Sequence, residues 1–271
     1  MIAVATLQAM NANRVGMMLR DWRRRRRLSQ LDLALEVGIS TRHLSFVETG
    51  RSRPSPEMLE RLAGALQVPL RERNQLLLAA GYAPQYEART LDDPALGPIR
   101  DALGRLLTGH EPYPALAVDR AWNLVASNAA LGPLLEGVSP KLLEPPVNCM
   151  RLSLHPDGLA PRIVNLAEWR RHLVHRLDRQ LTLTGDGELA DLLEELRAYP
   201  AGEPAVGPGT PAEEVMVTLR LATERGELTF FSTVTTFGTA LDITVSEISI
   251  EAFFPADTQT TEALSAAVAV G

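Results

Sequence analysis

The chain has 271 residues, of which 45% are apolar, values typical of one large or two ordinary globular domains with a sizeable core. It contains no run of about eighteen apolar residues, so we expect no transmembrane helix and no membrane partner. A disulfide framework within one chain is excluded by the single cysteine, Cys149, and the N-terminus lacks the features of a secretory signal. Both observations favour a cytoplasmic protein.

Charge is divided unevenly along the chain. Residues 1–89 carry 14 arginines and 8 acidic side chains, a net charge of +6, whereas residues 90–271 carry a net charge of −12. The first third therefore has the electrostatic footprint of a segment that contacts nucleic acid, although the whole chain is acidic.

The first third of the sequence predicts five short helices between residues 13 and 81. The first helix has an apolar face at spacing i, i+3, i+4 and i+7, formed by Val15, Met18, Leu19 and Trp22. Ser29 and Ser40 are suited to cap the second and third helices, which we expect over residues 30–37 and 41–48. Two more helices follow, and the five leave no room for a sheet.

The second and third predicted helices are joined by a tight turn at Gly38, which is the spacing of a helix-turn-helix unit. In such a unit the second helix enters the major groove of DNA with its N-terminal residues at the base edges. Arg42 is placed there to pair bidentately with guanine, whereas Gln30 and the arginines after the helix are placed to bind phosphates. The candidate DNA-binding residues are Gln30, Ser40, Thr41, Arg42, His43, Ser45, Arg51 and Arg53. The alternative is a small helical bundle with an arginine-rich solvated face.

After residue 83 the pattern becomes mixed. The expected segments are a helix-turn-helix domain over residues 13–83, a linker over 84–94, a second domain over 95–258 and a tail over 259–271. Two short strands are expected within 114–128, and three more over 214–223, 227–236 and 242–254. Helices are expected over 128–135, 166–183 and 188–198, and residues 136–164 are expected to be irregular.

Apolar faces of these elements point to a candidate ligand pocket. Strand and helix periodicity places the aromatic and aliphatic residues of several elements on common faces. The candidate ligand-binding residues are Trp122, Trp169, Leu173, Val217, Leu219, Phe230 and Thr235. Two alternatives remain open: such faces more often form a packed core than a cavity, and Thr235 is equally well explained as a β-branched strand residue.

Other chemistry finds little support. Glu168, His172 and His175 share a helix face at metal-ligand spacing, but the arginines beside them would repel a cation. A self-cleaving Ser-Lys peptidase needs a lysine beside its serine, and the single lysine, Lys141, lies in an irregular segment. We therefore expect no enzyme activity, no metal and no required cofactor.

The segment "LSQLDLALEVGISTRHLSFVETGRSRPSPEMLERLAGALQVP" resembles the XRE/Cro-C1 family of helix-turn-helix repressors. The residues that carry the resemblance are Leu28-Ser29-Gln30, Leu33-Ala34, Val37-Gly38, Ile39-Ser40, Glu48, Gly50 and Pro54. It covers about residues 14–80 and implies a five-helix, lambda-repressor-like domain that reads DNA with residues 40–46. It also implies an internal pair between Glu48 and Arg23. Thr41-Arg42 replaces the Gln-Gln of the phage repressors, so their operator sequences are not implied.

The segments "PYPALAVDRAWNLVASNAA", "LHPDGL" and "GELTFFSTVTTFGTALDITVSEISIEAFFPAD" resemble the MmyB-like ligand-binding domain that is attached to XRE regulators. The resemblance covers most of residues 95–258. It implies a PAS-like antiparallel sheet with helices folded over one face, and a fatty-acid-like or other apolar ligand.

We therefore expect an α+β protein that acts as a ligand-responsive transcription regulator. Repression is the expected output, and the sequence leaves activation open as the alternative. Its partners would be double-stranded operator DNA, a small molecule and a second copy of the chain, since paired heads match palindromic half-sites. The alternative is a C-terminal domain that only dimerises the chain or binds another protein, without a ligand.

Overall fold

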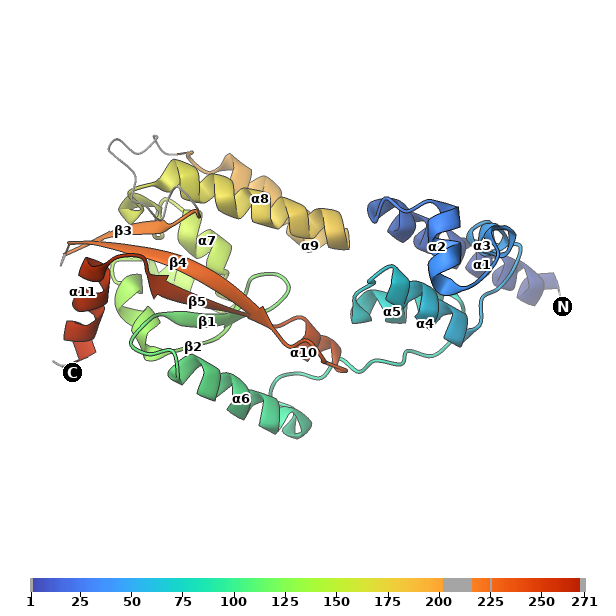
Figure 1. Cartoon of the computed structure of the whole chain (residues 1–271), viewed down its shortest axis with the longest axis horizontal. Coiled ribbons are helices and arrows are strands. Elements are labelled where there is room, and N and C mark those ends of the chain that lie inside the picture. The colour runs from blue at the N-terminus through green and yellow to red at the C-terminus, as the bar shows by residue number, and fades with distance from the viewer. Residues whose placement is uncertain (1, 202–215, 225, 269–271) are drawn as a thin grey trace. The chain divides into compact units, whose positions relative to one another are not determined.

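The computed structural model describes residues 2–201, 216–224 and 226–268, with side chains within residues 13–265 of these ranges. The described residues form two compact units. The first comprises residues 1–89 with residues 182–184 and 239–246, and the second comprises the rest of the chain. Each unit has a hydrophobic core of its own. Figure 1 labels the helices and strands of the chain.

The first unit is helical, and its helix ends are fixed by local capping. Its helices are α1 (Ile2–Arg25), α2 (Gln30–Val37), α3 (Thr41–Glu48), α4 (Pro56–Ala65), α5 (Leu70–Ala79) and the short α10 (Ile243–Ser246). Ser29 Oγ accepts a hydrogen bond from the Asp32 amide, and the Asp32 carboxylate accepts one from the Ser29 amide. Gly38 ends α2 in the left-handed conformation, with φ of 74°, which glycine adopts without steric cost. The predicted helical N-terminal domain is thus confirmed, but its first helix is 24 residues long and begins at Ile2 instead of near residue 13.

Helix α3 approaches α1 closely at Gly16. A Cβ atom on Gly16 would lie 2.5 Å from the carbonyl oxygen of Val47 and 2.6 Å from that of Glu48, so the approach requires glycine. Leu44 and Val47 of α3 are fully buried in the core that the helices of this unit share. These contacts determine which side of α3 faces away from the core.

A buried ion pair also joins α1 to α3, as the family resemblance implies. Arg23 Nε and Nη2 donate to the two carboxylate oxygens of Glu48 at 2.6 and 2.9 Å, and Gln30 Nε2 donates to Glu48 Oε2 at 2.8 Å. Burial opposes ionisation of Glu48, but the hydrogen bonds from Arg23 and Gln30 outweigh it and hold the pKa of Glu48 below the usual carboxyl value. Three helices therefore meet at one charged carboxylate.

The second unit is built on an antiparallel sheet with the strand order β2-β1-β5-β4-β3. Its strands are β1 (Ala115–Val118), β2 (Leu124–Ser127), β3 (Leu219–Thr223), β4 (Gly226–Thr236) and β5 (Ser249–Pro255). Its helices are α6 (Gly97–Thr108), α7 (Cys149–Leu154), α8 (Leu166–Thr184), α9 (Gly187–Ala198) and α11 (Thr258–Val268). Short 3₁₀ segments are η1 (Pro94–Leu96), η2 (Ala129–Leu135), η3 (Pro140–Leu143) and η4 (Ala160–Arg162). The predicted α+β class is confirmed.

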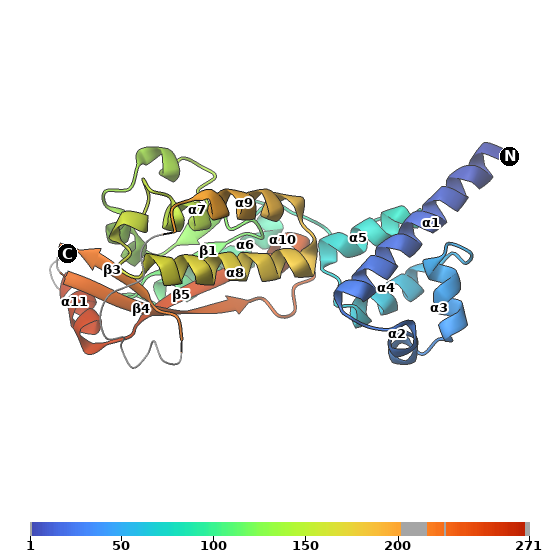
Figure 2. The same ribbon diagram turned by 90° about the horizontal axis from the view of Figure 1, so that it is seen from above.

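Different helices cover the two faces of this sheet. Along β5, Ile250 packs with Leu103 and Leu107 of α6, whereas Phe253 packs against the larger core that α7, α8 and α9 complete. In Figures 1 and 2, α8 and α9 lie side by side on one side of the sheet, and Figure 1 places α6 on the other. None of the described helices combines the length and the apolarity needed to cross a lipid bilayer.

Strand β5 begins later than the sequence predicts. Alternating hydrophobicity over 242–254 predicts a single strand, but this stretch first forms α10, and β5 starts at Ser249. Asp242 explains the difference, because its Oδ1 accepts hydrogen bonds from the amides two and three residues later and starts a helical turn. The strand predicted over 214–223 is described from residue 216 onward and begins at Leu219.

Three helical segments also differ from the sequence prediction. Helix α6 was not predicted, and α7 lies within residues 136–164, which were expected to be irregular. Asn148 starts α7 by accepting a hydrogen bond from the Arg151 amide at 3.2 Å, and six residues are too few to show helical periodicity. The helix predicted over 128–135 is the tighter 3₁₀ segment η2, which accommodates Pro133.

Gly16→Ala tests the close approach of α1 and α3. The new Cβ would meet backbone oxygens of α3, so we expect the unfolding free energy to fall by about 1–3 kcal/mol. Gly64→Ala in α4 is the matched control, because nothing lies within 4 Å of its added Cβ. This control should raise stability by up to about 1 kcal/mol. Denaturant unfolding of the full chain, with hydrogen exchange to assign the change to the first unit, measures both, and equal effects would contradict the close approach.

Candidate nucleic-acid interface and ligand cavity

Helix α3 exposes its polar N-terminal residues, while its Leu44 and Val47 are buried in the core. The predicted base-contacting residues that remain exposed or partly exposed are Ser40, Thr41, Arg42, His43 and Ser45. Ser40 has a structural role as well, because its Oγ accepts a hydrogen bond from the His43 amide at 3.1 Å and caps the helix. Arg42, one residue into α3, is exposed and is the cation nearest to the helix start.

Phe46, a residue that sequence reasoning missed, lies between two exposed arginines. The guanidinium carbon of Arg42 is 5.3 Å from the centre of the Phe46 ring, and that of Arg51 is 5.9 Å from it. Both distances lie within the range of cation–π attraction. The ring therefore positions one arginine of α3 and one of the following loop. The i, i+4 spacing of Arg42 and Phe46 on a helix was the signal that could have revealed this contact.

Arg53 and Gln30, both predicted to bind phosphate, are partly committed to the fold. Arg53 is exposed, but its guanidinium carbon lies 4.6 Å from the centre of the Tyr82 ring, which holds it against the end of α5. Gln30 stands at the N-terminus of α2, and its amide nitrogen donates to Glu48. Arg53 thus presents an oriented cation. Gln30 has one amide N–H bonded to Glu48, so its second amide N–H is the side-chain donor that it can offer to a phosphate.

A cavity of about 80 Å³ lies in the core of the second unit. Five of the predicted ligand-binding residues line it: Trp122, Trp169, Leu173, Leu219 and Phe230. Most of the other lining residues are leucines, and the polar exceptions are Cys149, Ser153 and Glu251. The cavity is therefore largely apolar, with a few polar groups in its wall, as is usual for small-molecule sites.

Val217 and Thr235 do not line the cavity. Val217 precedes β3 and packs at the margin of the surrounding core. Thr235 is exposed and pairs with Ile250 on β5, which faces α6. Because Thr235 follows Phe230 by five residues, an odd number, the two side chains project to opposite faces of the sheet.

Glu251 forms the charged part of the cavity wall. It is only 7% exposed, and its Oε1 accepts hydrogen bonds from Arg176 Nη1 at 2.9 Å and from Ser232 Oγ at 2.8 Å. The Arg176 guanidinium carbon lies 4.3 Å from the centre of the Trp122 ring, and Trp122 Nε1 donates to Gln180 at 2.8 Å. This network links α8 to the sheet through a cavity-lining tryptophan.

The backbone of Trp122 has an unusual conformation. Its φ is +68°, which bulky residues rarely adopt. The turn that contains it is held by Asp119, whose Oδ1 accepts hydrogen bonds from the amides of Ala121 and Asn123. The strained backbone places the indole in the cavity wall, and such strain is found preferentially at functional sites.

The remaining polar groups near the cavity are neutral or occupied. Ser153 Oγ accepts a hydrogen bond from Trp169 Nε1 at 2.9 Å. Burial, reinforced by Glu251 and Asp119, raises the pKa of the Cys149 thiol to about 12.

The helix face weighed as a metal site is engaged in other contacts. His172 stacks on Trp169 with ring centres 5.4 Å apart, and burial followed by the charge of Arg176 lowers the pKa of His172. Within the described ranges, no three His, Cys, Asp or Glu side chains converge in a way that could hold a metal ion.

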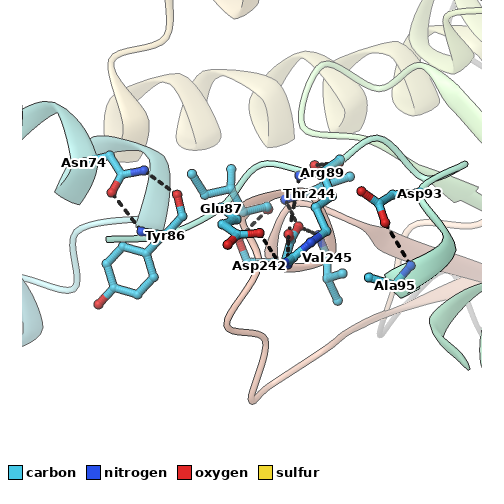
Figure 3. Close-up of polar contacts among 11 residues, drawn as sticks. Asn74, Tyr86, Glu87, Arg89, Asp93, Ala95, Asp242, Thr244 and Val245 are labelled. Carbon is cyan, nitrogen blue, oxygen red and sulfur yellow. Dashed lines mark hydrogen bonds and ion pairs between the residues drawn. The ribbon is translucent and has the colours of Figure 1, made fainter. Parts of the chain in front are cut away.

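A cluster of polar contacts within the first unit orders the segment after α5 (Figure 3). Asn74 Oδ1 accepts hydrogen bonds from the Gln85 and Tyr86 amides at 2.9 and 3.1 Å, and Asn74 Nδ2 donates to the Tyr86 carbonyl at 2.7 Å. Further along, the Asp242 carboxylate accepts from the Arg89 guanidinium at 3.1 Å, and Thr244 Oγ1 donates to the Arg89 carbonyl at 2.6 Å. Residues 84–94 look like a plain linker in the sequence, but these contacts hold part of that stretch.

Comparison with known proteins agrees with both halves of this description. Residues 99–267 match the family model described as the MmyB-like transcription regulator ligand binding domain, and residues 19–73 match a helix-turn-helix model. Over 68 residues, 25% of this chain, the sequence is 40% identical to the uncharacterized HTH-type transcriptional regulator RghRB of Bacillus subtilis strain 168. The match spans 47% of that relative, about half of its length. The two resemblances inferred from the sequence are thereby confirmed.

The thiol of Cys149 provides a test of the cavity wall. Because a thiolate is the reactive species and the pKa is about 12, we expect iodoacetamide at pH 8 to label the folded chain about a thousandfold more slowly than free cysteine. Intact-mass spectrometry measures this directly, since the chain has one cysteine. The same protein in guanidinium chloride is the control and should label rapidly. Fast labelling of the folded chain would place Cys149 outside a buried wall.

Proposed function

Because the chain belongs to the family of MmyB-like transcription regulators, we propose that it represses transcription from an operator until a small apolar ligand binds its C-terminal domain. The observation that carries the DNA-binding part is the exposed Arg42 at the start of α3, on a helix fixed from behind by buried contacts. A role on operator DNA places the protein in the cytoplasm, and no enzyme activity is needed for it.

The proposed DNA contacts divide into two kinds. Thr41, Arg42, His43 and Ser45 on α3 are the candidates for base edges, with Arg42 the residue suited to a bidentate pair with guanine. Arg51 and Arg53 are the candidates for phosphates, since both are exposed cations held in place by aromatic rings. We propose that a homodimer presents two such helices to half-sites about 34–36 Å apart.

The proposed ligand is a compact apolar molecule or the end of a fatty-acid-like chain. An apolar cavity that accepts benzene has a volume of about 150 Å³, whereas this cavity has about 80 Å³. A long acyl chain would therefore need the cavity to open. A ligand that binds the open form better than the closed one shifts the population between them, which is the condition for control. The alternative, a domain that only pairs two chains, predicts no effect of any ligand on operator affinity.

The contacts of residues 85–89 suggest how such a shift would be passed on. Strand β5 supplies Glu251 and Phe253 to the cavity, and the chain that enters β5 begins with Asp242 and α10. Asp242 is 8% exposed, and its carboxylate accepts a hydrogen bond from Arg89. Arg89 is the last residue of the segment 85–89 that follows α5. We expect movement of β5 to change the contacts between Asp242 and Arg89, and thereby the order of this segment.

Arg42→Ala tests the assignment of α3. Loss of one bidentate base contact should weaken binding to the preferred operator by about 1–3 kcal/mol and relax the preference at one base position. Arg53→Ala should instead lower affinity for all sequences and reduce the salt dependence by about one phosphate contact. Operators selected from random DNA, titrated by fluorescence anisotropy at several salt concentrations, measure both effects. Arg105→Ala, an exposed arginine of α6, is the control. Unchanged operator affinity of Arg42→Ala would refute the assignment.

Asp242→Asn tests the contacts after α5. The substitution keeps the oxygen that starts α10 but removes the charge that binds Arg89. We expect the amides of residues 87–89 to exchange about tenfold faster, the equivalent of ~1.4 kcal/mol, because Asp242 holds Arg89 whereas Asn74 holds residues 85 and 86. Hydrogen–deuterium exchange with mass spectrometry measures this. Asp257→Asn, which alters the aspartate that caps α11, is the matched control and should leave that segment unchanged. Equal exchange rates in the two variants would show that the Asp242 carboxylate does not protect the backbone amides before and at Arg89.

A further inference from the structure

We infer that the cavity selects a neutral ligand with a hydrogen-bond donor, such as an alcohol or amide, which binds Glu251 Oε2, and that it rejects carboxylate anions. This inference rests on the proposed ligand-sensing function and narrows the chemical class of the ligand.

The first argument is the free oxygen of Glu251. Both hydrogen bonds to this carboxylate end on Oε1, and within the described part of the chain none reaches Oε2. Among the described residues, one side-chain nitrogen or oxygen atom is both fully buried and without a hydrogen-bond partner, and that atom is Arg170 Nε. Because Glu251 Oε2 also lacks a partner but is not fully buried, it must touch open space. Glu251 is 7% exposed and lines the cavity, and we therefore assign that open space to the cavity. A buried carboxylate oxygen without a donor is costly, and a ligand donor would remove that cost.

The second argument is that the charge of Glu251 is already compensated. Arg176 Nη1 binds Oε1 at 2.9 Å, and the Arg176 guanidinium rests on the Trp122 ring. Arg176 is not among the residues that line the cavity, so its charge is not offered to a ligand. A cationic ligand is therefore unnecessary, and a neutral hydroxyl or amide N–H satisfies the free oxygen.

The third argument excludes an anionic head group. A carboxylate in this cavity would face Glu251. The indole N–H groups of the lining residues Trp122 and Trp169 already donate to Gln180 and Ser153, which leaves the side chains of Ser153 and Cys149 as donors to it. Ser153 is a single neutral donor, and the Cys149 thiol is a weak one. Two neutral donors do not compensate the loss of hydration of a buried anion. The same serine hydroxyl can bond to the oxygen of an alcohol, which donates to Glu251 at the same time.

The size of the cavity limits the ligand that enters without rearrangement. An apolar cavity of about 150 Å³ accepts benzene, so a volume of about 80 Å³ admits only a few heavy atoms until the cavity opens. Hexan-1-ol exceeds that volume and therefore tests the opened form of the cavity that the proposed function requires. Methyl pentyl ether is its isomer and can accept but not donate, and hexanoate carries the anionic head group. These three compounds differ at the position that the inference concerns.

The experiment measures binding of the three compounds to the full chain by calorimetry and by the shift in melting temperature. We expect hexan-1-ol to bind at least tenfold more tightly than the ether, and hexanoate not to bind. Glu251→Gln replaces the free oxygen by an amide that can donate, so it should lower the preference for hexan-1-ol over the ether and admit hexanoate. Ser232→Ala, which removes a partner of Oε1 but leaves Oε2 unchanged, is the matched control and should keep the wild-type preference.

The outcomes separate this inference from the proposed function. Binding of the alcohol and the ether with equal affinity, or binding of hexanoate to the wild-type chain, would overturn the inference while supporting a ligand cavity. If none of the three compounds binds to the wild-type chain or to Glu251→Gln, the ligand-sensing function itself is overturned, and the inference with it. A Glu251→Gln variant that keeps the melting transition, binds hexanoate and shows a lower preference for hexan-1-ol over the ether would support both.

Discussion

The direction of α3 depends on one buried carboxylate. Glu48 lies at the end of α3 and receives hydrogen bonds from Arg23 of α1 and Gln30 of α2. A buried charge that loses a partner costs several kcal/mol, so these helices cannot separate without a large penalty. The close approach at Gly16 brings the backbones together at the same end of α3. The exposed side chains at its other end, Arg42 among them, take their direction from this arrangement.

The second unit uses a buried carboxylate for a different purpose. Glu48 has both oxygens paired, which specifies structure, whereas within the described part of the chain the hydrogen bonds to Glu251 all end on one oxygen. Fully satisfied polar networks make a protein rigid, and an incompletely satisfied one leaves an interaction to be completed from outside. The paired oxygen also explains why an anion is tolerated at all in a wall made mostly of leucines: Arg176 supplies its counter-charge from α8.

Local signals predicted well, and contacts between distant segments did not. Ser29 and Gly38 specify helix ends through their nearest neighbours, and helices α2–α5 of the first unit followed from such local signals. Trp169 and Leu173 followed from the periodicity of α8. The side of the sheet for Thr235 was available from its odd spacing to Phe230. The roles of Glu251 and Asp242 were not, because their partners Arg176 and Arg89 lie 75 and 153 residues away in the sequence.

The first unit combines residues 1–89 with residues 239–246, which the ribosome adds much later. Helices α1–α5 are complete once residue 79 has been made, and Asn74 of α5 holds residues 85 and 86, but the contacts of Arg89 need Asp242 and Thr244. Domains fold as they emerge from the ribosome, N-terminal part first. In a nascent chain, helices α1–α5 can therefore fold long before Arg89 gains its hydrogen bonds with Asp242 and Thr244. Any product that terminates before residue 239 would keep the residues of α1–α5 and lack the partners of Arg89 on α10 and at its start.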